Sequence, residues 1–170
     1  MNIFAFDPCP TQSALWLDDK RKNKMILESC QLMSSAIRQL DPFTILPVYK
    51  LTHQGHPCTK WTRVSRANFK WVLTYTKALY DQKTGGHKSS ELFPLFDDYV
   101  VNGSFPVEHW TPFVNCARNI SVGLDFTSVS CVHTAYKQYI MQRWLRDTLS
   151  PTWKWGVDPL ATNEWKELIK

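Results

Sequence analysis

The sequence predicts a mainly α protein, a compact single-domain helical bundle with a loop-rich C-terminal half. Three observations support this. A chain of 170 residues with 44% hydrophobic and 21% charged residues can bury the core of one globular domain. Apolar side chains recur at helical spacing in two long segments of the first half. In the second half, Pro94, Gly103, Pro106 and Pro112 interrupt residues 87–115, which are expected to be mostly loop.

The first helical segment extends to Leu40. Its apolar positions follow one another at steps of 4, 3, 4 and 3, which places them on one face of a helix. These positions are Ile26, Cys30, Met33, Ile37 and Leu40. Thr11 or Ser13 can cap the beginning of this segment, and Asp41-Pro42 ends it.

The second segment begins at His56, which can act as a helix cap because Pro57 suits the first helical position. The helix is expected to run to about Tyr80, before Gly85-Gly86. Residues 1–82 then form a basic helical core that carries the candidate site. Residues 83–170 form a loop-rich extension with a helix near 128–147 and a Trp-rich tail that packs on the body.

The positive charge of the chain is concentrated in its first part. Residues 1–70 hold 10 of the 20 Lys and Arg but only 5 of the 15 Asp and Glu, so they carry the whole formal charge of +5. A basic patch on a small protein indicates a polyanionic partner, and nucleic acid is the first candidate. No protein partner can be named from the sequence.

The expected location is the cytoplasm. The first ten residues are interrupted by Asp7 and Pro8 and do not resemble a signal peptide. No apolar run approaches the roughly 18 residues of a membrane span, so no membrane association is expected. Five cysteines without paired short spacing indicate a reducing compartment.

The strongest candidate for chemistry is the basic beginning of the first helix, which contains Lys20, Arg21, Lys22 and Lys24. At about 100° per residue, Arg21, Lys24 and Glu28 share the face opposite the apolar one. Clustered cations lower the pKa of an amine and make it more nucleophilic. A neighbouring carboxylate can stabilise an oxocarbenium-like sugar. The alternative is an ordinary surface ion pair, since Lys24 and Glu28 are four residues apart.

Two further groups have simpler alternatives. One is the basic and aromatic strip of Lys60, Trp61, Arg63 and Arg66. Its arginines could contact phosphates while Trp61 stacks on a base. Alternatively, the strip is an ordinary amphipathic helix whose aromatic rings point inward and whose arginines point outward. His53, His56 and Cys58 do not have the spacing of a familiar zinc site, so no metal is expected. As the cap of the second helix, His56 can also reach a phosphate or an active-site group.

Two of these segments, in this order, resemble the pyrimidine-dimer DNA glycosylases of the endonuclease V type, in a phage-borne branch. They are SALWLDDKRKNKMILESCQL (13–32) and HQGHPCTKWTRVSRANFKW (53–71). The shared pattern is Leu-Asp-x-Lys-Arg leading into a helix, then His-Pro with Trp four residues after the Pro. The later pieces GGHKSS (85–90), WTPF (110–113) and AYKQY (135–139) also look like that branch.

The resemblance implies a DNA glycosylase, with or without AP-lyase activity, that binds double-stranded DNA, flips a damaged or modified pyrimidine nucleotide and attacks the sugar with an amine. A phage-encoded chain of this kind would act in the cytoplasm of its bacterial host. No cofactor would be required. The implied nucleophile is the α-amine, which belongs to Met1 because Asn2 blocks removal of the methionine; Lys24 is the rival. Glu28 would be the carboxylate and Arg21 its electrostatic support. The residues expected to bind DNA are Lys20, His56, Trp61, Arg63 and Arg66.

Two alternative functions stay open. One is an enzyme that modifies a phage DNA base, or its nucleotide, on the same amine and carboxylate face. The other is a non-enzymatic protein that binds DNA or a host protein.

Overall fold

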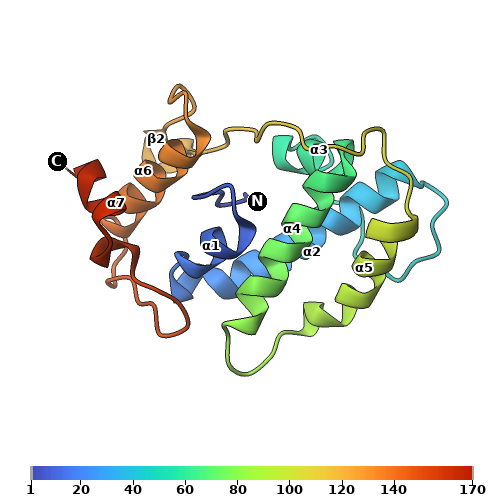
Figure 1. Ribbon diagram of the computed structural model, residues 1–170, viewed down its shortest axis with the longest axis horizontal. Coiled ribbons are helices and arrows are strands. Elements are labelled where there is room, and N and C mark those ends of the chain that lie inside the picture. The colour runs from blue at the N-terminus through green and yellow to red at the C-terminus, as the bar shows by residue number, and fades with distance from the viewer. Residues whose placement is uncertain (1, 170) are drawn as a thin grey trace.

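The computed structural model describes residues 2–169, and helices dominate it, which confirms the mainly α prediction (Figure 1). The α-helices are α1 (Pro10–Leu15), α2 (Asp19–Leu40), α3 (Pro57–Val64), α4 (Arg66–Asp81), α5 (Phe93–Asn102), α6 (Val132–Trp144) and α7 (Asn163–Lys166). The 3-10 helices are η1 (Lys88–Leu92), η2 (Ile120–Val122), η3 (Pro159–Ala161) and η4 (Glu167–Ile169). Strands β1 (Arg118–Asn119) and β2 (Leu124–Asp125) form one antiparallel pair.

Helix α2 is the long central element, and it packs against α3 and α4 (Figure 1). Helix α1 packs on α4, while α6 and the C-terminal segment lie at the other end of the molecule, beside the N-terminal segment. The buried apolar side chains form one cluster to which both halves of the sequence contribute. Its members include Phe6, Ile26, Tyr75, Ile140 and Trp165.

The beginning of α2 differs from the prediction. Neither Thr11 nor Ser13 caps it; instead Asp18 is the cap, and its carboxylate accepts a hydrogen bond from the Arg21 backbone N–H (3.3 Å). Ser13 is buried within the separate helix α1, where its hydroxyl pairs with the backbone of Asp7. Because Asp18 both caps the helix and meets the Arg21 side chain, the cap fixes the start of the basic face.

The single helix expected over residues 57–80 is two helices. Ser65 has an extended backbone, and its hydroxyl accepts hydrogen bonds from the N–H groups of Ala67 and Asn68, so it ends α3 and caps α4. The predicted cap at His56 is confirmed, because its Nδ1 accepts a hydrogen bond from the Cys58 N–H (3.1 Å).

The prediction that residues 87–115 are mostly loop is wrong for Lys88–Asn102, which form η1 and α5. Pro94 lies in the first turn of α5, where the missing N–H costs no helical hydrogen bond, so it begins a helix instead of breaking one. Helix α6 is shorter than the predicted 128–147.

Residues 150–169, here called the C-terminal strap, pack on the body as expected of the Trp-rich tail. The Asp19 carboxylate accepts hydrogen bonds from Thr152 Oγ1 (2.9 Å) and from the N–H groups of Lys154 (2.7 Å) and Trp155 (3.3 Å). The strap covers Lys22, whose side chain is fully buried. Lys22 therefore belongs to the basic run of the sequence but not to the face shared by Arg21, Lys24 and Glu28.

We predict that Gly156→Ala destabilises the protein by about 1–3 kcal/mol, the usual cost of overpacking. A Cβ at Gly156 would lie 2.4 Å from Lys22 Nζ and 2.5 Å from the Leu15 carbonyl oxygen, so the strap would have to move. Urea unfolding measures the loss. Gly55→Ala is the matched control, since a Cβ there meets nothing within 4 Å; equal stabilities of the two variants would contradict the packing described here.

Candidate active site

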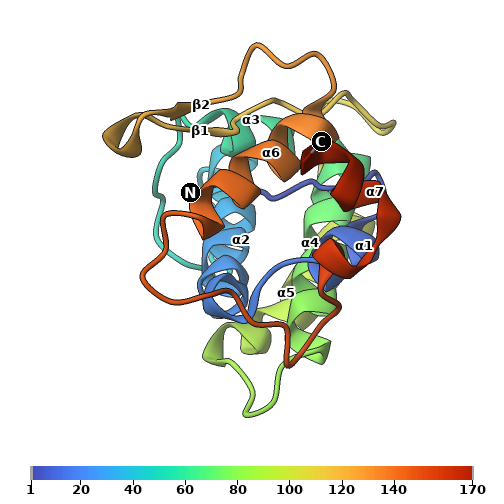
Figure 2. The ribbon, with the colours of Figure 1, turned by 90° about the vertical axis from the view of Figure 1, so that its left-hand side faces the viewer.

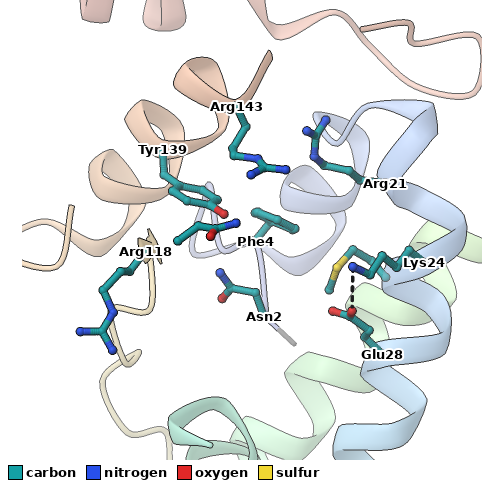
Figure 3. Close-up of a pocket in the computed structure, with 10 residues that line it drawn as sticks. Asn2, Phe4, Arg21, Lys24, Glu28, Arg118, Tyr139 and Arg143 are labelled. Atoms are coloured by element: carbon teal, nitrogen blue, oxygen red, sulfur yellow. Dashed lines mark ion pairs between the residues drawn. The ribbon is translucent and has the colours of Figure 1, made fainter. Parts of the chain in front are cut away.

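A pocket of about 220 Å³ lies between the first half of α2, the N-terminal segment, β1 and α6 (Figure 3). Its lining combines four cationic side chains, one carboxylate and two aromatic rings. The residues are Asn2, Phe4, Arg21, Lys24, Met25, Glu28, Arg118, Asn119, Tyr139 and Arg143. Three residues singled out from the sequence, Arg21, Lys24 and Glu28, thus line the same pocket.

Helix α2 supplies the amine and the carboxylate. Lys24 Nζ lies 3.4 Å from Glu28 Oε1, one helical turn away (Figure 3). The two side chains differ in exposure: Lys24 is 73% exposed, whereas Glu28 is 13% exposed. The carboxylate is therefore inside the pocket wall, and the amine is at the rim, where it can approach a ligand.

Arg21 is held in place by two carboxylates. Its guanidinium donates to Asp18 Oδ2 (2.9 Å) and to Asp147 Oδ2 (2.8 Å), and Asp18 also accepts a hydrogen bond from the Trp144 indole (2.8 Å). Burial raises the pKa of Asp147, but the hydrogen bonds from Lys20 and Arg21 outweigh it and hold that pKa below its usual value. A charged Asp147 thus fixes the orientation of Arg21 at the pocket.

The opposite wall comes from the second half of the chain, and the sequence analysis did not identify it. Tyr139 and Arg143 lie one turn apart on α6, and Arg118 and Asn119 lie on β1 (Figure 3). The spacing of Tyr139 and Arg143 is the one available signal, since residues four apart share a helix face. Nothing local indicates that this face meets α2.

Asn2 and Phe4 line the pocket from the N-terminal segment. The Asn2 side chain donates to the Cys116 carbonyl (3.1 Å) and accepts from the Tyr136 hydroxyl (2.8 Å). The Phe4 ring stacks with that of Tyr139, with centroids 6.2 Å apart. These contacts hold the segment across the pocket. Met1, the other predicted nucleophile, lies outside the described residues.

Trp61 does not lie at the surface, so its prediction as a stacking platform for DNA is wrong. It is 4% exposed, stacks on Phe113 with centroids 4.6 Å apart, and donates its indole N–H to the Thr111 carbonyl (3.2 Å). Its position in the apolar pattern of the helix explains this burial, as the amphipathic alternative stated.

The other predicted DNA-binding side chains lie outside the pocket lining. Arg63 donates to Gln39 and to the Gln54 carbonyl. Arg66 donates to the Gly103 carbonyl (2.8 Å) and pairs with Glu108. Their guanidinium groups thus serve as structural ties between segments. Lys20, 61% exposed, pairs with Asp147 beside Arg21.

His56 likewise has a structural contact as the cap of α3. Burial is the largest cause of the lowered pKa of its imidazole. Among residues 2–169, no three His, Cys, Asp or Glu side chains gather as metal ligands would.

Comparisons with protein-family models, curated protein sequences and solved structures find no match to this chain. Within residues 2–169, none of the helices combines the length and the apolar character that a membrane crossing needs.

Proposed function

We propose that the protein is a DNA glycosylase acting on damaged or modified pyrimidines, with the pocket as its active site. The observation that carries the proposal is that an amine, Lys24, and a carboxylate, Glu28, line one small pocket together with three arginines. The arginines are Arg21, Arg118 and Arg143. The cations suit the phosphates of a nucleotide, and the aromatic rings suit its base.

The size of the pocket supports a nucleotide turned out of the helix as the ligand. A cavity of about 220 Å³ suits one small group and cannot enclose a duplex. An enzyme that acts on the glycosidic bond of duplex DNA must extrude its target from the stack. Lys20, which is exposed beside Arg21 but outside the pocket lining, would meet a phosphate next to the extruded nucleotide.

The proposed reaction uses an amine and Glu28. The neutral amine nitrogen forms a bond to C1′ while the bond from C1′ to the base breaks, and the base leaves with the electron pair and takes up one proton from that nitrogen. The Glu28 carboxylate stabilises the positive charge that develops on the sugar and relays the protons during the step. Opening of the sugar ring breaks the bond from C1′ to O4′, O4′ takes up the second proton of the nitrogen, and a Schiff base results, from which strand scission can follow by β-elimination.

Borohydride trapping tests this proposal. Duplex oligonucleotides with ultraviolet lesions, abasic sites or modified pyrimidines are incubated with the protein and reduced, and a covalent adduct is expected. Peptide mass mapping then distinguishes Met1 from Lys24, and Lys24→Ala must abolish the adduct if Lys24 is the nucleophile.

Other outcomes separate the alternatives. DNA that is bound but never trapped contradicts the Schiff-base route. An intact strand whose base has changed in mass indicates base modification in place of glycosidic cleavage, and binding without any product indicates a non-enzymatic protein.

A further inference from the structure

The hairpin of β1 and β2 projects from the body (Figure 2), and its first strand contributes to the pocket lining. Its turn consists of η2 and Gly123, whose φ of 67° closes the hairpin in a conformation that glycine adopts without strain. Arg118 and Asn119 at the root of the hairpin line the pocket. The tip therefore begins one residue beyond the pocket wall.

The root of the hairpin is anchored to the core. The Phe126 N–H donates to the Ala117 carbonyl (2.9 Å), and both Ala117 and Leu124 are buried. The Asn115 side-chain amide bridges the carbonyls of Phe126 (3.0 Å) and Val129 (3.2 Å). A tip on such a root holds its position relative to the pocket.

The tip itself is apolar and exposed. Ile120 is 75% exposed and Val122 is 38% exposed, and no charged residue lies between Asn119 and Leu124. The Asp125 carboxylate accepts hydrogen bonds from the Thr127 N–H (2.9 Å) and hydroxyl (2.6 Å), beyond the tip. Ile120 lies two residues after Arg118 of the pocket and nothing in the fold buries it, so its side chain is placed to contact a ligand that extends beyond the pocket.

We propose that Ile120, supported by Val122, is a wedge that enters the DNA stack and occupies the space left by the nucleotide turned into the pocket. Apolar side chains that insert between base steps unstack and kink the duplex. This inference rests on the proposed function and adds the residue that makes a paired nucleotide available to the site.

Other exposed apolar side chains fit this role less well. Leu145 lies at the end of α6 and lines a separate hollow with Trp144 and Leu160. Ile45 is 97% exposed, but it lies beyond the far end of α2 from the pocket. Ile45 is therefore a matched control: it is the same residue type, equally free to be truncated without a cavity, and remote from the site.

The experiment compares Ile120→Ala with Ile45→Ala on two substrates, one with the target nucleotide paired and one with it unpaired opposite a gap. Ile120→Ala is expected to lower turnover about tenfold or more on the paired substrate, because the variant lacks the side chain that separates the stacked bases. On the unpaired substrate the loss is expected to be less than about twofold, since that nucleotide leaves the stack more easily. Ile120→Leu should restore turnover, and Ile45→Ala should equal the wild type on both.

A second readout does not depend on chemistry. With 2-aminopurine beside the target, binding of the wild type is expected to raise the fluorescence, and binding of Ile120→Ala is not. Equal fluorescence for both proteins at saturation, or equal loss of turnover on both substrates, overturns the wedge. If the wild type turns over neither substrate, the proposed function is contradicted instead. The fluorescence comparison then still shows whether Ile120 enters the DNA stack.

Discussion

Glu28→Gln is expected to lower glycosylase turnover by about 10²–10⁴-fold, the range of a lost acid-base group, while DNA affinity stays within about twofold. Glutamine keeps the shape of the side chain but has no negative charge to stabilise the sugar and no proton to exchange. DNA affinity is expected to persist because the arginines of the pocket and the lysines at its rim are unchanged. Single-turnover kinetics and equilibrium binding at one salt concentration measure the two effects.

The control for this variant is Glu91→Gln in η1, an exposed glutamate outside the pocket lining. It makes the same chemical change and is expected to leave turnover unaltered. A Glu28→Gln protein that retains full turnover would remove Glu28 from the mechanism. Loss of both turnover and binding would indicate that the carboxylate mainly organises the pocket.

The second prediction concerns Lys22, whose ammonium is buried without a hydrogen-bond partner and lies 3.9 Å from Asp19 Oδ1. Burial lowers its pKa from 10.5 to about 8, and the nearby Asp19 and Asp18 oppose part of that effect. Between pH 8 and 10.5 the unfolded chain holds more protons at this site than the folded one. The contribution of Lys22 to the free energy of unfolding therefore rises with pH across that window, by on the order of 3 kcal/mol in total.

Lys22→Met is expected to increase the free energy of unfolding at pH 7 by about 1–3 kcal/mol, because a buried charge is replaced by an apolar side chain of similar length. Most of the gain should be gone by pH 10.5, where the lysine is neutral in the folded state and half-neutralised in the unfolded one. Urea unfolding of the wild type and the variant at pH 7 and pH 10.5 measures this difference. Lys60→Met, at an exposed position of α3, is the control and should show no such pH dependence.

The spacing of residues along the chain predicted those features that depend on contacts within one helix. The opposite faces of α2 follow from helical periodicity, so the shared face of Arg21, Lys24 and Glu28 could be predicted before any fold was known. The cap at His56 could also be predicted locally, because Pro57 marks the first position of a helix. The break at Ser65 could not be predicted in this way, because its extended backbone also pairs with Val107 of a distant loop.

The wall of the pocket that was not predicted, formed by β1 and α6, depends on tertiary contacts. Arg118 and Arg143 belong to the part of the sequence whose formal charge sums to zero, so a count of charges hides them. Lys22 belongs to the same basic run as Lys24, yet it is buried because the C-terminal strap passes over it. Neither outcome can be read from spacing along the chain.

The partners of Arg21 and Asp19 also bear on when the site can form during synthesis. Asp147 lies 126 residues after Arg21, and Thr152 lies 133 residues after Asp19. A growing chain on the ribosome can build α2 and the Arg21–Asp18 pair early, but the second carboxylate that holds Arg21 is missing until Asp147 has emerged. Contacts of such long sequence separation form late in folding. The chain therefore acquires its complete pocket only after Asp147 has left the ribosome, so a nascent chain still short of Asp147 would lack this contact to the Arg21 guanidinium.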